Sequence, residues 1–314
     1  MKVLSYFNGD WYINQLKRPY YDSPPYQLYL SDETGRYGPY DPLYIQERTD
    51  QSIRWDKYIK ALKGKNPRLL IQTMAGDEYF ILPSRALTIP VDGKRMNVRV
   101  KENYLSKSDM AILDLIYSNG LSRPMYFNFT SLNSLGIDVK SYLRQEGLIY
   151  KLSTEKNPSQ DIEIDCDKMY ENLVIRSNYT NLADPEVYFN HEDYQQRMIN
   201  PLKQAFNHLI GEYIEKREIN KAREIVDFAI KNIYFSHFEP GFPDIQMAKY
   251  LRLFEERTAA NDLVRRVFEF HFKKVAKSGQ IDKVGLYLLQ ESVRFLDDAE
   301  VIRRYNQLMT SLRG

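Results

Sequence analysis

The chain has 314 residues, of which 43% are hydrophobic and 27% charged. A chain of this length can bury an ample core and suits one large domain or two smaller ones. Its 44 basic and 42 acidic residues leave a net charge of +2, which gives no electrostatic case for binding nucleic acid or an anionic bilayer. The single cysteine, Cys166, excludes an intrachain disulfide but does not fix the compartment.

No stretch of the sequence approaches the roughly 20 consecutive apolar residues that a membrane-spanning helix needs. The apolar run that follows Met1 and Lys2 ends at Asn8, and it is shorter than the ~7–15 residues of a signal-peptide core. Taken literally, the sequence predicts a cytoplasmic protein.

The N-terminal part predicts short elements separated by turns. Residues 3–6 fit a short strand, and Asp10 is expected to cap the helix that follows. The segment 20–38 is rich in Tyr, Pro and Gly, with one strand expected at 26–30. Apolar residues recur at helical spacing around 53–62, which predicts a second helix there.

The segment 69–100 is the β-rich part of the sequence. Its alternating apolar runs are separated by Gly76-Asp77 and by Asp92-Gly93. An Asp-Gly pair between such runs is a strong hairpin signal. We expect a small mixed sheet here, extended by strands from the segment that follows.

The segment from Leu105 to Leu152 predicts a helix, a strand, a short helix and a final strand. Ser108 is expected to cap the first helix, and Gly120 to end it in a left-handed conformation. Alternation over 125–129 predicts the first strand. A second helix is expected over 138–147, from an opening Asp to a closing Gly.

The sequence from residue 190 onward follows a helical pattern. Three helix pairs are expected, at about 191–217 with 220–234, 244–256 with 259–277, and 281–295 with 298–312. Pro201 should kink the first helix or mark its true start. The first pair fits the tetratricopeptide spacing, with core positions at Phe206, Leu209, Tyr213, Ala222, Val226 and Ala229. The later pairs match only in length and amphipathicity.

Four acidic residues alternate over 161–167 and invite comparison with a calcium-binding loop. An EF-hand loop needs Gly at its sixth place and Glu at its twelfth, where this chain has Cys166 and Asn172. We interpret the run as a strand with Ile162 and Ile164 facing inward, followed by a helix.

Other catalytic or metal chemistry is not indicated by the sequence. No histidine stands in a metal-ligand spacing, the four being His191, His208, His237 and His271. No nucleophile elbow, phosphate-binding loop or dinucleotide fingerprint occurs. We therefore expect no catalytic residue, no metal and no cofactor in this chain.

Tyrosine is abundant, with 25 residues in the chain, and it clusters over 20–44. Tyrosine rings stack on sugar rings and populate protein interfaces. Two interpretations stay open. The cluster contacts a glycan or peptide, or it pins an irregular loop against the sheet.

Five blocks of the sequence resemble one family. In chain order they are DWYINQLKR at 10–18, RPMYFN at 123–128, YLRQEGLIYKL at 142–152, DCDKMYENL at 165–173 and ADPEVYF at 183–189. Together they resemble multi-spanning membrane glycosyltransferases of GT-C type, related to protein O-mannosyltransferases and abundant in Bacteroidota. The resemblance covers most of the chain and keeps the order of the blocks.

The resemblance implies a place for this chain within a larger enzyme. It would be the water-exposed C-terminal region, on the periplasmic face of the inner membrane, with the transmembrane region preceding Met1. The whole enzyme would move a sugar from a polyprenyl-phosphate-linked donor to hydroxyls of an exported protein. The catalytic carboxylate of such enzymes lies in a membrane-proximal loop that has no counterpart here. The implied role is acceptor recognition or scaffolding, with the transmembrane region, exported acceptor proteins or glycans as partners.

Two of the family-like blocks supply candidate binding residues. Asp10, Trp11 and Tyr12 stand at a predicted helix start, and Arg123 and Tyr126 at a predicted strand start. The ends of such elements often line clefts, although packing roles for these residues stay open.

The sequence as a whole predicts an α+β domain with a small mixed sheet over 1–180. An all-α helical-hairpin domain, similar to tetratricopeptide repeats, is expected over 181–314. The alternative function is a stand-alone interaction adaptor whose helical hairpins form a concave groove. A soluble enzyme with its own glycan-active cleft is a third class, which no motif supports.

Overall fold

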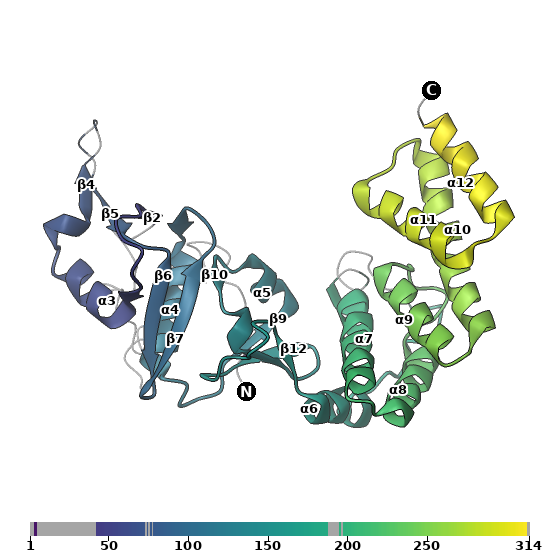
Figure 1. The fold of residues 1–314 in the computed structure, drawn as a ribbon, viewed down its shortest axis with the longest axis horizontal. Helices are drawn as coiled ribbons and strands as arrows, with labels where there is room; N and C mark the ends of the chain where they lie inside the picture. Colours follow the sequence, from purple (N-terminus) through teal and green to yellow (C-terminus); the bar gives the residue numbers. More distant parts are fainter. Residues whose placement is uncertain are drawn as a thin grey trace. The chain divides into compact units, whose positions relative to one another are not determined.

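A computed structural model describes residues 3–4, 42–187 except 73, 75 and 77, and then 195 and 197–312. The chain divides into two compact units, Met1–Asp165 and Cys166–Gly314. The first combines small sheets with helices, and the second is helical (Figure 1). The expected α+β region followed by an all-helical region is confirmed.

The described part of the first unit holds three small sheets. The first has the order β1 (Val3–Leu4), β9 (Tyr126–Asn128), β12 (Ile149–Leu152), β11 (Leu143–Gln145), β13 (Glu163–Ile164). The second has the order β10 (Ile137–Asp138), β7 (Lys94–Val100), β6 (Ala86–Val91), β3 (Ile53–Arg54). The third has the order β4 (Leu70–Gln72), β5 (Glu78–Leu82), β2 (Leu43–Ile45), β8 (Tyr104–Leu105). The strands therefore form three sheets instead of one extended sheet.

The β6–β7 hairpin confirms its sequence signal. Asp92 and Gly93 have φ values of 46° and 72°, and two consecutive left-handed residues are what a two-residue hairpin turn requires. Leu87 and Ile89 on β6 and Val98 on β7 alternate into the core. Helices α3 (Trp55–Lys63) and α4 (Lys107–Asn119) pack against β6 (Figure 1).

The start of α4 differs from the prediction by two residues. Ser106, and not Ser108, is the N-cap, and its Oγ accepts a hydrogen bond from Asp109 N at 3.2 Å. Ser106 N in turn donates to Asp109 Oδ2, which completes a capping box. Asp109, three residues after Ser106, therefore fixes Ser106 as the N-cap of α4. Gly120 ends the helix with φ 58°, as expected.

The helix predicted over 138–147 is wrong. Ile137–Asp138 forms β10, which pairs with β7, and a short 3-10 turn at Lys140–Tyr142 leads into β11. Pairing of β11 with β12 overrides the local helical signal.

The predicted strand over 125–129 also ends early, because Asn128 accepts a hydrogen bond from Ser131 N at 2.7 Å and caps α5 (Phe129–Ser134).

The second unit begins with α6 (Cys166–Tyr170), and its later helices follow the predicted pairs closely. They are α7 (Asn200–Glu215), α8 (Ile219–Asn232), α9 (Phe242–Leu253), α10 (Arg257–Ser278), α11 (Lys283–Leu296) and α12 (Ala299–Ser311). Pro201 lies in the first turn of α7, directly after a π-helical stretch at 197–199, so it marks the change from π-helix to α-helix. All six core positions proposed for the first pair are buried.

Candidate functional site

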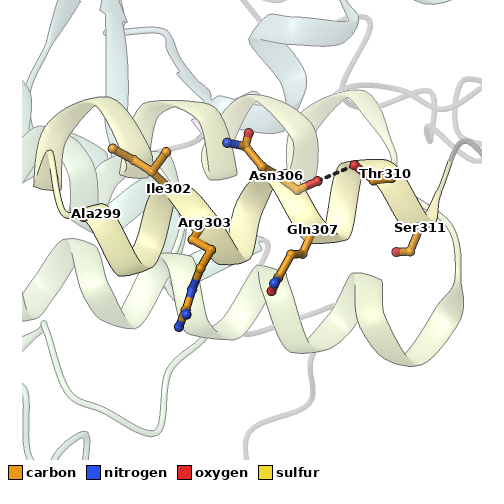
Figure 2. Close-up of a pocket in the computed structure, with 7 residues that line it drawn as sticks. All are labelled: Ala299, Ile302, Arg303, Asn306, Gln307, Thr310 and Ser311. Atoms are coloured by element: carbon orange, nitrogen blue, oxygen red, sulfur yellow. Dashed lines mark hydrogen bonds between the residues drawn. The ribbon is translucent and has the colours of Figure 1, made fainter.

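The described residues form several hollows, and the first lies over α12 alone. Figure 2 shows its seven lining residues, all from that one helix. Thr310 Oγ1 donates to the backbone oxygen of Asn306 at 2.9 Å (Figure 2), so this hydroxyl is used within the helix. Because one exposed helix face brings no groups from other elements together, this hollow offers no catalytic arrangement.

A second hollow lies beside β7 and β10. It is lined by Arg85, Arg99 and Lys101 among others, but two of these cations have structural partners. Arg85 donates to Glu47 and to the backbone oxygens of residues 101 and 102. Lys101 Nζ donates to Leu135 O at 2.7 Å. These cations join strands and loops of the first unit.

The third hollow is a groove of about 650 Å³ between the start of α9, the end of α10 and the start of α11. We call it the α9–α11 groove. Its volume falls within the ~300–1,000 Å³ of small-molecule pockets. From α10 it receives residues spaced by three and four, which one helical face presents together: His271, Lys274, Val275 and Ser278.

Apolar side chains line the outer part of the α9–α11 groove and remain exposed. Phe242 is half-exposed at the first position of α9, and its ring lies 6.3 Å from that of the half-exposed Tyr287 on α11. Val284 is 65% exposed beside them, while Leu288 is buried at the base. An exposed cluster of this kind is typical of a surface that receives apolar side chains of a ligand.

His271 supplies a directed polar group in the groove wall. Its Nε2 lies 3.1 Å from Pro240 O, and because a carbonyl oxygen only accepts, Nε2 must carry the proton. Burial lowers the pKa of His271, and nearby Lys274 acts in the same direction. The ring is therefore neutral at pH 7 and its Nδ1 is an acceptor. Nδ1 lies 4.0 Å from where a Cβ on Gly285 would stand.

A buried ion pair fixes the start of α9, and with it one wall of the groove. Lys203 Nζ on α7 lies 2.9 Å and 3.1 Å from the two carboxylate oxygens of Asp244. Asp244 Oδ2 also accepts a hydrogen bond from Gly241 N at 2.9 Å. Asn207 Nδ2, one turn further along α7, donates to Pro243 O. These contacts place the α9 start against α7 and so position Phe242.

The exposed apolar lining of the groove is that of a binding surface. A hydrolytic or transfer site needs a nucleophile beside a base, or a metal. Within the described ranges, no group of three or more His, Cys, Asp and Glu could hold a metal ion. The acidic run at 161–167 contains the two-residue strand β13, where Glu163 accepts a hydrogen bond from Arg144, and α6 follows it. The predicted strand and helix are therefore present, but residues 162–165 are all half-buried and do not alternate between inside and outside.

Comparison with protein families gave a match that covers the first unit. The sequence matches the family model described as TMEM260-associated domain 2 over residues 1–169. The chain belongs to this family. Comparison with curated proteins and with solved structures gave no match.

TMEM260-associated domain 2 spans the α+β unit, so the α9–α11 groove lies outside the matched residues. The expected relation is confirmed at the level of this domain, and the glycosyltransferase context stays a prediction. Among the residues with a described conformation, no helix is long and apolar enough to cross a membrane.

The five predicted binding residues all fall within TMEM260-associated domain 2. Asp10, Trp11 and Tyr12 lie outside the described residues. Arg123 is exposed in the loop before β9, and its backbone oxygen accepts a hydrogen bond from Asn119. Tyr126 is buried in β9, between β1 and β12. A binding role for these residues stays a prediction.

Sequence reasoning missed Phe242 and His271, which line the groove, and Tyr287, whose ring lies beside that of Phe242. Each occurs singly within a helical pattern, and none belongs to a motif. One signal was available: on an amphipathic helix, Val284 and Tyr287 are three residues apart and share a face, and both are apolar where a solvent-facing position is expected to be polar.

Proposed function

We propose that this chain is a non-catalytic region of a membrane glycosyltransferase, in which the α9–α11 groove binds the acceptor polypeptide. In this proposal the whole enzyme transfers a lipid-linked sugar to protein hydroxyls at the periplasmic face of the inner membrane. The family match over residues 1–169 supports the enzyme context, together with the resemblance of the sequence blocks to transferases related to protein O-mannosyltransferases. The groove is the observation that carries the binding role.

The dimensions and lining of the groove favour an extended polypeptide as its ligand. A stable interface between folded proteins buries about 800 Å² per partner, whereas a hollow of about 650 Å³ accommodates a few side chains. Phe242, Val284 and Tyr287 would contact apolar side chains of an unfolded segment. Neutral His271 and the exposed Lys274 would contact its backbone or its acidic groups.

The direct test is binding of an unstructured, Ser/Thr-rich peptide that carries leucine and valine, measured by fluorescence anisotropy with the whole chain. Val284→Glu places a charge among the groove's apolar side chains and should weaken binding at least about tenfold. The matched control is Ile219→Glu, because Ile219 is 45% exposed on α8, outside the groove. Equal binding by both variants would remove the groove from the proposal.

The enzyme context has a separate test in membranes that contain the full-length transferase. There, Val284→Glu should raise KM for the acceptor and leave kcat nearly unchanged, because a binding groove acts before chemistry. The chain by itself should transfer no sugar from a lipid-linked donor. Transfer by the isolated chain would contradict the non-catalytic role.

A helical-hairpin interaction adaptor is the second candidate, and the same groove favours it. An adaptor would capture its partner through the groove with no connection to sugar transfer. The two functions separate in one experiment: in an adaptor, Val284→Glu abolishes partner capture and leaves acceptor glycosylation unchanged.

A further inference from the structure

A row of tyrosines crosses the outer face of the β4-β5-β2-β8 sheet. Tyr44 on β2 lies directly opposite Tyr104 on β8, and opposite residues of an antiparallel pair point to the same face. Tyr44 also pairs with Ile81 on β5, so Tyr79, two residues earlier, shares that face. The rings of Tyr44 and Tyr79 lie 5.7 Å apart, edge to face. We call these three residues the tyrosine face.

Tyr44 and Tyr104 are the exposed members of the tyrosine face, whereas Ile81, which pairs with Tyr44 on that face, is fully buried. Tyr44 is 43% and Tyr104 45% exposed, while their neighbours Leu43 and Leu105 are fully buried. Ile45 N donates to Asn103 O, which makes Tyr44 and Tyr104 a non-hydrogen-bonded pair, the type that holds side chains closest together. The backbone therefore fixes two exposed aromatic side chains next to each other.

Polar groups border the tyrosine face on the β2 side. Gln46 N donates to Leu82 O, so β2 continues in an extended form and Gln46 shares the face of Tyr44. Arg48 donates to Gln46 Oε1 at 2.6 Å and to Arg68 O at 2.9 Å. These bonds orient the Gln46 amide, whose Nε2 donates to no other residue of the described ranges.

We propose that the tyrosine face is a carbohydrate-binding site for a short neutral oligosaccharide. A sugar ring presents C–H groups on its faces and hydroxyls around its edge. Tyr44 and Tyr104 offer ring surface to the C–H groups, and Gln46 and Arg48 offer hydrogen-bond donors to the hydroxyls. This site lies in the first unit and is independent of the α9–α11 groove.

The size of the tyrosine face argues against a folded protein as its ligand. A whole aromatic side chain supplies about 150–250 Å², so three partly exposed tyrosines supply less than the roughly 800 Å² of a stable interface. Charge argues against single-stranded nucleic acid, which needs a basic groove along its backbone. Arg48 is engaged with Gln46 and Arg68, and Arg85 near the β8 end pairs with Glu47, so these cations form no continuous basic groove along the face.

Saturation-transfer-difference NMR on the whole chain tests the site, because it detects weak binding. The probes are mannotriose, cellotriose and xylotriose at millimolar concentrations. At least one should give a saturable signal. The Tyr44→Ala/Tyr104→Ala variant should bind it about tenfold or more weakly.

Two further variants keep the test decisive. Tyr44→Phe/Tyr104→Phe retains both rings and should bind within about threefold of the natural chain, because stacking uses the ring and not the hydroxyl. Phe242→Ala/Tyr287→Ala, which removes an exposed aromatic of the α9–α11 groove and the ring beside it, should bind sugar normally. The proposal is overturned if no trisaccharide binds, if the alanine pair at 44 and 104 leaves binding unchanged, or if that pair abolishes binding of the acceptor peptide instead.

Discussion

Replacing Asp244 by asparagine tests the buried ion pair that positions α9. Lys203 and Asp244 are both fully buried, and the ammonium also lies 4.9 Å from the centre of the Tyr234 ring. Burial lowers the pKa of Lys203, and the Asp244 carboxylate opposes this by favouring the charged form. The asparagine amide in Asp244→Asn would retain an acceptor oxygen for Gly241 N, so the main loss is the charge partner of Lys203.

The cost of Asp244→Asn has an upper limit set by deprotonation of Lys203. Removing one partner of a buried pair typically costs about 3–5 kcal/mol of unfolding free energy. Lys203 can instead lose its proton: from a reference pKa of 10.5 to pH 7, at about 1.4 kcal/mol per pH unit, this costs about 5 kcal/mol. We therefore expect a loss of about 3–5 kcal/mol at pH 7, a large share of a typical total of about 5–15 kcal/mol.

This reasoning predicts a pH signature. The unfolded Lys203 of the variant stays protonated up to pH 10.5, whereas the folded one loses its proton at lower pH. Because the unfolded state then binds more protons, the variant gains stability as pH rises between the two pKa values. The deficit of Asp244→Asn should therefore be smaller at pH 9 than at pH 7.

Urea unfolding followed by far-UV circular dichroism measures these differences in the helical unit. Lys203→Met/Asp244→Asn removes both charges and should return to within about 2 kcal/mol of the natural chain. Lys221→Gln breaks an exposed pair with Glu218 in the same unit and should leave the midpoint unchanged. A deficit for Asp244→Asn that matches the Lys221→Gln control, or no recovery in the double variant, would refute the assigned role of the pair.

Three further substitutions test the packing and titration of other groups. Gly136→Ala would place a Cβ 2.5 Å from the buried Asp109 Oδ2, so thermal unfolding should show a loss of about 1–3 kcal/mol. Ser106→Ala removes the α4 cap and should cost about 1 kcal/mol, with faster amide exchange in the first turn, whereas Ser106→Thr should exchange normally. Burial lowers the pKa of His271, so the unfolded state binds a proton near pH 6.5 that the folded state resists. The natural chain should then lose more stability than His271→Gln between pH 7 and pH 5.

The helical unit could be predicted from sequence because its signals are local and periodic. Phe206 and Tyr213 on α7, and Ala222 and Ala229 on α8, recur at the spacing that puts them on facing surfaces, and all four are buried. Pro201 lies in the first turn of α7, where the preceding π-helical stretch gives way to α-helix. These signals depend on a few neighbouring residues and not on distant partners.

The first unit was harder to predict because its strands are short and depend on pairing with distant segments. Segment 138–147 has an acidic residue at its start and Gly near its end, as a helix would, but β10 pairs with β7 and β11 with β12. Three-residue strands such as β11 carry too few alternations to show a period. The Asp92-Gly93 hairpin was predictable because its pairing partners are adjacent in sequence.

The residues of the candidate sites come from separate segments of the sequence, and only the fold brings them together. Tyr44 falls within the predicted tyrosine cluster, but Tyr79 and Tyr104 lie in separate segments, and only the β5-β2-β8 order brings the three together. The same holds for Phe242 and Tyr287, whose rings meet because α9 and α11 both pack on α10. A useful sequence signal does exist in both places. It is an aromatic residue at the position where an amphipathic strand or helix should turn a polar side chain to solvent, as Tyr44 does between the inward-facing Leu43 and Ile45. One such residue alone is ordinary, and the signal becomes informative only where the fold gathers several of them into one patch.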